Sequence, residues 1–296
     1  MALRALADRL ARAGVPAPEH DAEALLLHAL GLTRAALWLA PEAPVSGAES
    51  DRLEGLGRER ERRVPLQLLL GSIPFHGVTL EVRPGVFIPR PETETLIEAV
   101  LTALAAGPGA AAIPPGRALP PAGRLLDLGT GTGAVALALL AALPGWGGVA
   151  VDRSRAALDL AARNAERNGL AGRLALVCAD FSDSVFAPPG GPFDLLLSNP
   201  PYVPRGAIGS LEPEVRDHDP PEALDGGVDG LDALRHLARG TGLWVRPGGL
   251  VALEIGADQA DPAVGMFGPH LSGIRVITDL AGRPRVLTGW TRGRDA

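Results

Sequence analysis

Lysine is absent from this sequence, so all 28 of its basic residues are arginines, and cysteine occurs only once, as Cys178. A single cysteine cannot form an internal disulfide, which excludes a disulfide-stabilised scaffold and fits a reducing compartment. We expect Cys178 to pack as a small apolar residue. Hydrophobic residues make up 46% of the chain and charged residues 21%. This balance is typical of a folded globular protein and argues against disorder.

Long apolar runs are also missing, because the run Ala24 to Leu27 ends at His28 and a membrane span needs about 18 such residues. Acidic residues outnumber basic ones by 34 to 28, which gives a net charge of -6. This charge provides no broad positive field for a phosphate backbone. We therefore expect a cytoplasmic monomer that binds neither a membrane nor nucleic acid directly.

The six histidines are scattered along the chain and have neither a cysteine partner nor the spacing of a metal site. We therefore expect no metal centre. The alternating basic and acidic residues from Arg58 to Arg63 are typical of a solvated helix face. The acidic residues Asp217 and Asp219 flank His218, and we expect all three in a polar loop near the substrate entrance.

Hydrophobic spacing divides the chain into three parts. Leucines recur at three-to-four spacing in residues 1–70, which predicts a small helical bundle. Residues 71–90 mix Gly and Pro with alternating Val, Leu and Phe, which predicts a hairpin linker. From residue 91 to residue 296, strand and helix patterns alternate, apart from the Pro/Gly/Ala-rich stretch 107–123, where we expect a mobile surface loop.

The alternation in 91–296 predicts an α/β fold with a doubly wound parallel sheet, as in Rossmann-like proteins. We expect helices over 95–105 and around 231–238, and parallel strands over residues 124–128, 148–151, 174–178, 193–198 and 250–255. The segments 274–279 and 285–290 flank Ala-Gly-Arg-Pro and predict a closing antiparallel hairpin at the C-terminal end.

A glycine-rich turn lies between a hydrophobic strand and an Ala/Leu-rich helix, and such a turn lets a ligand approach the backbone. Its residues are Gly129, Thr130, Gly131, Thr132 and Gly133. Asp152 closes the next strand, where a carboxylate can accept hydrogen bonds from ribose hydroxyls. The spacing fits a nicotinamide dinucleotide as well as S-adenosyl-L-methionine.

Asp127, two residues before the first glycine, favours S-adenosyl-L-methionine over a nicotinamide dinucleotide. The pattern Asp-x-Gly-x-Gly-x-Gly resembles the first motif of class I methyltransferases, where Asp127 would help to hold the ammonium group of the cofactor. Phe181 follows the third strand and is expected to contact the adenine, although core packing is an equally good interpretation.

Four residues directly after the fourth strand form the candidate reaction site: Asn199, Pro200, Pro201 and Tyr202. They suit a planar nitrogen, whose lone pair is delocalised and which must be held by both of its hydrogens. The Asn199 side-chain oxygen and the Pro200 carbonyl can accept those hydrogens, and the two prolines stiffen the backbone. Tyr202 can pack against the planar group. Asn199 is also expected to border the cofactor.

Taken together, several blocks resemble the protein-(glutamine-N5) methyltransferases of the PrmC/HemK type. The resemblance covers about residues 63–290 and rests on Pro65-Leu-Gln67, Phe87 to Glu94, Asp127 to Gly133, Asn199 to Tyr202, Leu211 to Arg216 and Ala223 to Leu231.

The resemblance implies methyl transfer from S-adenosyl-L-methionine, leaving S-adenosyl-L-homocysteine, to the glutamine of a Gly-Gly-Gln motif in class 1 peptide chain release factors. Asn199 to Tyr202 would grip the glutamine amide, Gly129 to Gly133 and Asp152 would hold the cofactor, and the N-terminal bundle would help to dock the release factor. Arg90, Glu92 and Glu94 would organise the linker, or form a surface ion-pair network.

Other functions also fit parts of the pattern. A ribosomal-protein glutamine methyltransferase would carry a similar site. A nucleic-acid amino methyltransferase would share Asn199 to Tyr202, and an NAD-dependent dehydrogenase or a catalytically silent binding module would share the glycine turn.

Overall fold

We describe the protein from a computed structural model, in residues 2–39, 45–107, 121–183 and 186–292. Most of the loop expected over 107–123 lies outside these described residues. The chain forms two compact units. The first contains Met1–Ile73, Val82–Pro84 and Glu212–His218, and the second contains Pro74–Glu81, Gly85–Leu211 and Asp219–Ala296. The first unit therefore includes two short segments that lie outside the expected range 1–70.

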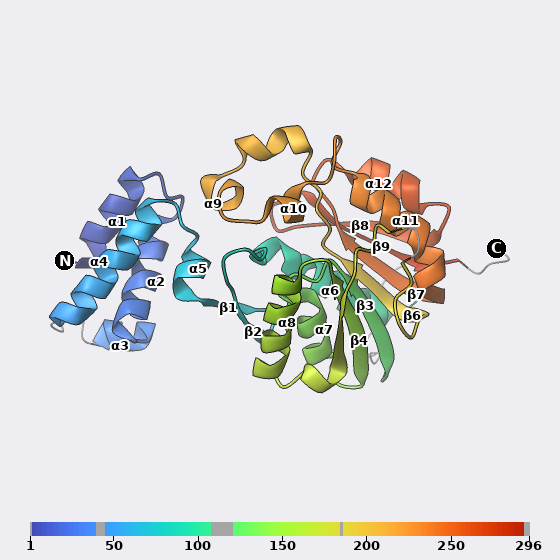
Figure 1. Cartoon of the computed structure of the whole chain (residues 1–296), viewed down its shortest axis with the longest axis horizontal. Coiled ribbons are helices and arrows are strands. Elements are labelled where there is room, and N and C mark those ends of the chain that lie inside the picture. The colour runs from blue at the N-terminus through green and yellow to red at the C-terminus, as the bar shows by residue number, and fades with distance from the viewer. Residues whose placement is uncertain (1, 40–44, 108–120, 184–185, 293–296) are drawn as a thin grey trace. The chain divides into compact units, whose positions relative to one another are not determined.

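The first unit is a helical bundle (Figure 1). Its helices are α1 (Ala2–Arg12), α2 (Pro18–Leu30), α3 (Arg34–Leu39), α4 (Gly47–Glu61), α5 (Leu66–Leu70) and α9 (Pro213–Arg216). Aliphatic side chains such as Leu10 and Leu25, both fully buried, form its core. At the start of α4, Ser46 accepts a hydrogen bond from the Glu49 N–H, and the Glu49 carboxylate accepts one from the Ser46 N–H. This reciprocal cap satisfies two free donors.

An ionic network joins α9 to the bundle. Arg60 is only 4% exposed, and its guanidinium lies 2.7 Å from both Asp21 and Glu214. Arg63 lies 2.6 Å from Glu214. The expectation of a solvated face over 58–63 is therefore wrong for Arg60, although Arg58 is exposed as expected. Local alternation could not reveal Arg60, because its partners are 39 and 154 residues away.

This network also controls the protonation of Glu214. Burial by itself would raise the pKa of Glu214, but hydrogen bonds from Arg63 and Arg60 lower that pKa to about 2. Glu214 therefore stays charged at neutral pH. Because its pKa is lower in the folded protein, its contribution to stability is present above the ordinary value of 4.5 and is lost as the pH falls toward 2.

The second unit is built on one sheet, whose strand order in the described residues is β5-β4-β3-β6-β7-β9-β8. Its strands are β3 (Gly123–Leu128), β4 (Trp146–Asp152), β5 (Leu174–Cys178), β6 (Phe193–Ser198), β7 (Val245–Glu254), β8 (Leu271–Thr278) and β9 (Pro284–Thr291). The first five are parallel, and β9 runs antiparallel to β7 and β8. The doubly wound sheet and its C-terminal antiparallel hairpin are confirmed.

Two local expectations about this sheet need correction. The strand expected at residue 250 begins earlier, at Val245, directly after a helix that ends at Trp244. Cys178 is exposed, so the expectation that it packs as an apolar core residue is wrong. It is the last residue of β5, which lies at the edge of the sheet, where a side chain has neighbours on fewer sides.

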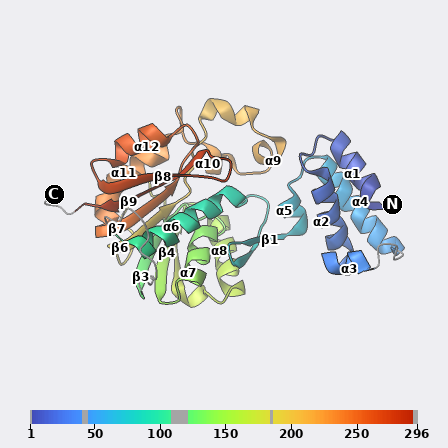
Figure 2. The same ribbon diagram turned by 180° about the vertical axis from the view of Figure 1, so that it is seen from behind.

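Helices cover both faces of the sheet. One group is α6 (Glu94–Ala106), α7 (Ala134–Ala142) and α8 (Arg155–Arg167), and α7 contacts both of the others. Figure 2 shows α6 in front of the strands. The second group is α11 (Asp232–Trp244), which packs on β7, and α12 (Ala260–Phe267), which contacts α11. Among the described residues, no helix has the length and apolar character needed to cross a membrane.

Shorter elements complete the described chain. They are β1 (Ser72–Phe75), β2 (Val78–Glu81), η1 (Pro91–Thr93), η2 (Ala171–Arg173), η3 (Arg205–Ser210) and α10 (Pro221–Leu224). β1 and β2 pair as the hairpin expected in 71–90. The fully buried Asn164 of α8 accepts a hydrogen bond of 2.7 Å from the Glu81 N–H. It also donates to the Thr132 carbonyl at 3.0 Å, which connects β2 to the glycine turn.

We predict that Arg60→Met lowers the free energy of unfolding by about 3 kcal/mol, because it leaves the Asp21 and Glu214 carboxylates without their shared partner. Urea denaturation at pH 7 would measure this loss. The matched control is Arg58→Met, which removes an exposed arginine that pairs with Glu54 on the same helix. Its expected cost is about 0.5 kcal/mol. Equal costs for the two variants would contradict the prediction.

Candidate active site at the carboxyl edge of the sheet

The register of the parallel strands brings the expected site residues to one edge of the sheet. A single row across four strands contains Val151, Leu128, Ser198 and Leu253. Each of these four residues is followed in the chain by one residue nearer the carboxyl edge. These following residues lie side by side along the edge, in the order Asp152, Gly129, Asn199 and Glu254. The chain moves outward from β3 to β5 and returns to β6 on the other side of β3. Ligands bind at such a switch point in open α/β sheets.

The glycine turn is shaped by left-handed backbone at Gly129 (φ 72°), Gly131 (φ 56°) and Gly133 (φ 81°). At Gly133 a side chain would also crowd its neighbours, because an added Cβ would lie 3.1 Å from Leu137 and 3.3 Å from Ala161. At Gly131 an added Cβ would meet nothing within 4 Å. The backbone of Gly131 therefore faces open space, as a ligand-binding turn requires.

Asp127 supports this turn from inside the protein. It is only 1% exposed, and the Thr130 hydroxyl donates to its carboxylate at 2.7 Å. Burial raises the pKa of Asp127 to about 6, although hydrogen bonds from Thr130 and from the Ala136 N–H oppose that rise. Asp127 thus joins the turn to the first turn of α7. Its expected contact with the ammonium group of a cofactor stays a prediction.

Asp152 and Phe181 border the same turn. The Asp152 carboxylate accepts hydrogen bonds of 2.9 Å from the Gly131 N–H and from the Ser154 N–H. It is half-buried, and the expected contact with ribose hydroxyls stays a prediction. Phe181 packs against the core, and its ring edge would lie 3.9 Å from a Cβ added at Gly129. The Phe181 ring therefore packs against the core and also lies beside the glycine turn.

Asn199 lies half-buried between β6 and η1, and its Nδ2 donates to the Thr93 hydroxyl at 3.2 Å. Its side chain is therefore not turned into the core. Pro200 is buried and Pro201 is half-buried, so the rigid backbone expected here is also packed against its surroundings. The roles assigned to Asn199, Pro200 and Pro201 in gripping an amide stay predictions.

Tyr202 is held at both ends. Its hydroxyl donates to the Glu254 carboxylate at 3.4 Å, and its carbonyl accepts a hydrogen bond from the Gln259 amide at 3.0 Å. Burial is the largest cause that raises the pKa of Tyr202, so the phenol stays protonated. Gln259 also donates to the Gly230 carbonyl and accepts from the Gly256 N–H, at 3.0 and 2.9 Å.

Sequence reasoning missed Glu254, Gln259 and Thr93 as members of the site. Glu254 is 1% exposed, and burial raises its pKa to about 7 despite a hydrogen bond from Thr93. The sequence could have indicated Glu254, because it is a charged residue at the end of a hydrophobic strand, and that strand, β7, pairs with β6. Thr93 had no such signal, because only the folded chain brings it to Asn199, 106 residues away.

The charged residues before α6 make specific contacts within the second unit. Arg90 pairs with the buried Asp219, which also accepts a hydrogen bond of 3.2 Å from the Ile88 N–H. Glu94 accepts from the His76 N–H at 3.2 Å, and so binds the hairpin turn. Glu92 lies 3.9 Å from Arg283 in an exposed pair. Arg90 and Glu94 thus organise the linker, whereas Glu92 belongs to a surface pair.

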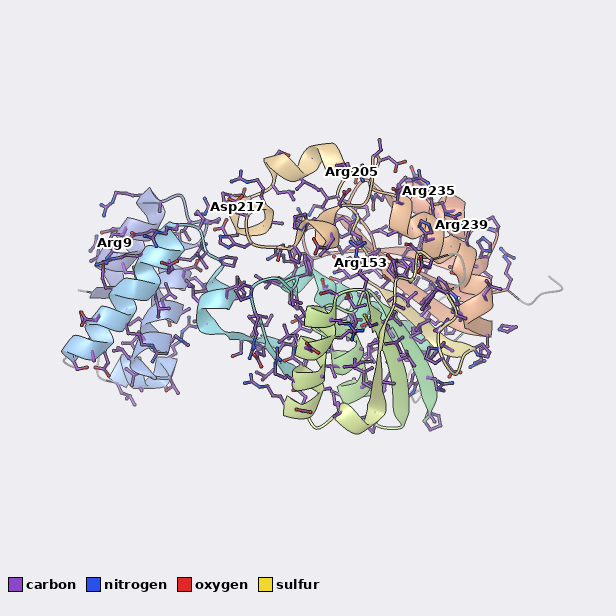
Figure 3. All side chains as sticks on the ribbon, in the orientation of Figure 1. Arg9, Arg153, Arg205, Asp217, Arg235 and Arg239 are labelled. Carbon is purple, nitrogen blue, oxygen red and sulfur yellow. The ribbon has the colours of Figure 1, made fainter. Side chains whose placement is uncertain are left out.

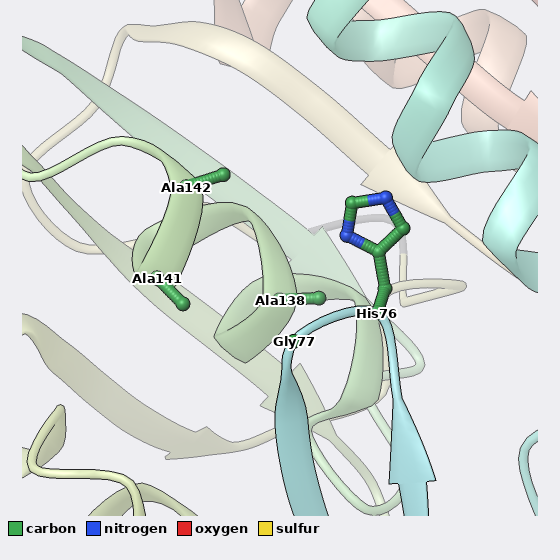
Figure 4. A pocket seen from close by; sticks show the side chains of 5 residues that line it. All are labelled: His76, Gly77, Ala138, Ala141 and Ala142. Atoms are coloured by element: carbon green, nitrogen blue, oxygen red, sulfur yellow. The ribbon is translucent and has the colours of Figure 1, made fainter.

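A separate pocket lies between α7 and the hairpin turn, lined by His76, Gly77, Ala138, Ala141 and Ala142 (Figure 4). Its alanine walls offer no side-chain hydrogen bonds, and the His76 imidazole is bonded to Glu98 at 2.7 Å. The polar side chains gather instead at the carboxyl edge, where carboxylates, an amide and the glycine turn lie close together.

Two family models match parts of this chain. Residues 1–71 match the model of the PrmC N-terminal domain, and residues 116–210 match the methyltransferase small domain. A release factor glutamine methyltransferase of Cereibacter sphaeroides is 41% identical over 288 residues, covering 97% of this chain and 96% of its own. One of Rhodospirillum rubrum is 40% identical over 282 residues, covering 94% and 81%.

Solved structures support the same fold. A methyltransferase from Pyrococcus furiosus matches with a TM-score of 0.51 at 17% identity, covering 73% of this chain and 90% of its own. The 16S rRNA N2 G1207 methyltransferase of T. Thermophilus matches with a TM-score of 0.50 at 21% identity, covering 75% and 50%. Because curated relatives at about 40% identity span nearly the whole chain, the chain belongs to the release factor glutamine methyltransferase family.

Proposed function

We propose that this protein methylates the side-chain amide nitrogen of the glutamine in a Gly-Gly-Gln motif of class 1 peptide chain release factors, and so supports translation termination. As a member of its family, the chain is an S-adenosyl-L-methionine-dependent methyltransferase. The observation that carries the substrate proposal is the position of Asn199 to Tyr202 directly beside the Gly129 to Gly133 turn, on neighbouring strand ends. In this arrangement, oxygens of Asn199 and Pro200 that accept from an amide would lie next to the turn that would hold the cofactor.

The residues of the chain prepare the amide for reaction. The Asn199 Oδ1 and the Pro200 carbonyl accept its two hydrogens and direct the nitrogen lone pair toward the cofactor turn. When bound, S-adenosyl-L-methionine supplies an electrophilic methyl group on sulfur. Transfer of that methyl group from sulfur to the nitrogen held by Asn199 and Pro200 would leave S-adenosyl-L-homocysteine. The nitrogen then loses a proton to water, so no strong base is required.

The cofactor would be held by the Gly129 to Gly133 backbone, by Asp152 and by Phe181, with Asn199 at its reactive end. The open space at Gly131 and the half-buried Asp152 carboxylate beside it fit this group. We also propose that the first unit docks the release factor, and that the protein acts in the cytoplasm as a monomer.

A nucleic-acid amino methyltransferase is the rival that shares Asn199 to Tyr202. Three exposed arginines of the second unit that Figure 3 labels, Arg153, Arg205 and Arg235, argue against it because each pairs with a carboxylate. Arg153 lies 3.8 Å from Asp180, Arg205 lies 2.9 Å from Asp225, and Arg235 pairs with Asp229. Phosphate binding at these positions would compete with existing ion pairs.

We expect purified protein to add one methyl group to the Gly-Gly-Gln glutamine of a class 1 release factor, as detected by peptide mass spectrometry. A release factor with that glutamine changed to alanine is the control and should gain no methyl group. Parallel reactions would contain ribosomal proteins, DNA or RNA. Labelling of any of these in preference to the release factor would contradict the proposal.

Replacing the amide acceptor should stop the reaction without removing the cofactor. We predict that Asn199→Ala lowers kcat by about 100-fold or more, because the glutamine amide is no longer held in line. Its affinity for S-adenosyl-L-homocysteine, measured by calorimetry, should change by less than about threefold. The control Asn168→Ala removes an amide at the end of α8 and should keep most of the activity. Unchanged kcat in Asn199→Ala would exclude the proposed grip.

Cofactor affinity should depend on Asp152. We predict that Asp152→Ala weakens the binding of S-adenosyl-L-methionine by about 10- to 100-fold, since hydrogen bonds to a charged acceptor contribute about 1.5–3 kcal/mol. Calorimetry would measure this change, with NAD titrated separately to test the dehydrogenase alternative. Asp159→Ala changes an exposed aspartate of α8 and should bind the cofactor normally. Equal affinity of the two variants would refute a role for Asp152.

A further inference from the structure

A buried chain of polar groups connects Asn199 to the end of β7. The Asn199 Nδ2 lies 3.2 Å from the Thr93 hydroxyl. A hydrogen bond from the Thr93 side chain is also one of the causes that lower the pKa of the Glu254 carboxyl. Thr93 is 2% exposed and Glu254 is 1% exposed, so water does not compete for either group. The register pairs Ser198 with Leu253, which places Asn199 and Glu254 on neighbouring strand ends.

The Glu254 carboxylate fixes the direction in which the hydrogen bonds of this network are donated. A carboxylate has no hydrogen to donate, so the Thr93 hydroxyl must donate its single hydrogen to Glu254. The Thr93 oxygen is then left to accept, and only the NH2 end of the Asn199 amide can donate to it. The Asn199 Oδ1 must therefore point away from Thr93, free to accept a hydrogen from a substrate amide.

This orientation decides whether the site can work. An Asn side chain turned by 180° would present its NH2 group to the substrate, and two donors would then face each other. We infer that Glu254 is a positioning residue, which acts through Thr93 to hold the Asn199 amide with its oxygen toward the substrate nitrogen. This inference rests on the proposed methylation of an amide.

A second contact of Glu254 supports the same role. Tyr202 donates to the Glu254 Oε1 at 3.4 Å, so one carboxylate holds both the first and the last residue of Asn199 to Tyr202. The Glu254 Oε2 is buried and has no hydrogen-bond partner. Such a group is costly to keep in a folded protein and calls for an explanation beyond stability. Holding the acceptor segment in a single orientation provides one.

The charges around Glu254 make this orientation dependent on pH. Burial raises the pKa of Glu254 to about 7, and Glu92 of η1 raises it further, whereas Thr93, Arg285 of β9 and the Tyr202 hydroxyl lower it. Below that pKa the protonated carboxyl can itself donate to Thr93. The Thr93 hydrogen is then free to bond the Asn199 oxygen, which permits the unproductive orientation. Activity should therefore fall as the pH drops through about 7.

The first test removes the Thr93 hydroxyl. Thr93→Val has nearly the same shape but cannot bond to either partner, and we expect its kcat to fall about tenfold or more at pH 8. The KM for S-adenosyl-L-methionine should stay within about twofold, because the cofactor turn is unchanged. Thr93→Ser keeps the hydroxyl and should restore kcat to within about threefold of the wild-type value. Thr241→Val, a buried threonine of α11, is the matched control.

The second test removes the titrating group. Wild-type kcat should drop between pH 8 and pH 6, and Glu254→Gln should lose the ionisation near pH 7. The pH profile of Glu254→Gln also tests the positioning role of Glu254 if Thr93→Val does not fold. A kcat of Thr93→Val equal to that of the wild type, or an unchanged pH profile in Glu254→Gln, would overturn the inference. Failure of the wild type to methylate any glutamine would instead reject the proposed function itself.

Discussion

The hydrogen-bonded register between β6 and its neighbours β3 and β7 is the constraint on which the whole site depends. It places Gly129, Asn199 and Glu254 one after another along a single sheet edge. A slip of one residue would turn the Asn199 side chain to the opposite face. Backbone pairing in the sheet thus sets the distance between the glycine turn and Asn199 before any ligand binds.

Three carboxylates, of which Asp127 and Glu254 are buried and Asp152 is half-buried, give this edge its chemical character. Asp127 joins the glycine turn to α7, Asp152 accepts from Gly131, and Glu254 organises Asn199 and Tyr202. Burial raises the pKa of Asp127 to about 6 and that of Glu254 to about 7, so both charges are costly to hold at neutral pH. The three carboxylates accept hydrogen bonds, and each of them orients the neighbouring group that donates to it.

The segment after Tyr202 connects the two units covalently. It leaves the second unit after Leu211 and returns at Asp219. Within the first unit, Glu214 is held by the buried Arg60, and within the second, Asp219 is held by Arg90. Both attachments are ion pairs between residues more than 100 positions apart, so each depends on long-range folding and not on local helix propensity.

The parallel sheet with its closing hairpin, the glycine turn and the segment Asn199 to Tyr202 could be predicted from the sequence, because each rests on local patterns of apolar residues, Gly and Pro. Gly129 to Gly133 and Asn199 to Tyr202 each follow a hydrophobic strand directly, so their place at the carboxyl edge needed only the parallel topology. Tertiary structure alone decided the burial of Arg60, the exposure of Cys178 and the chain from Glu254 through Thr93 to Asn199. The physical reason is that a hydrogen-bond partner distant in sequence leaves no local periodicity, and only the packed sheet brings such groups together.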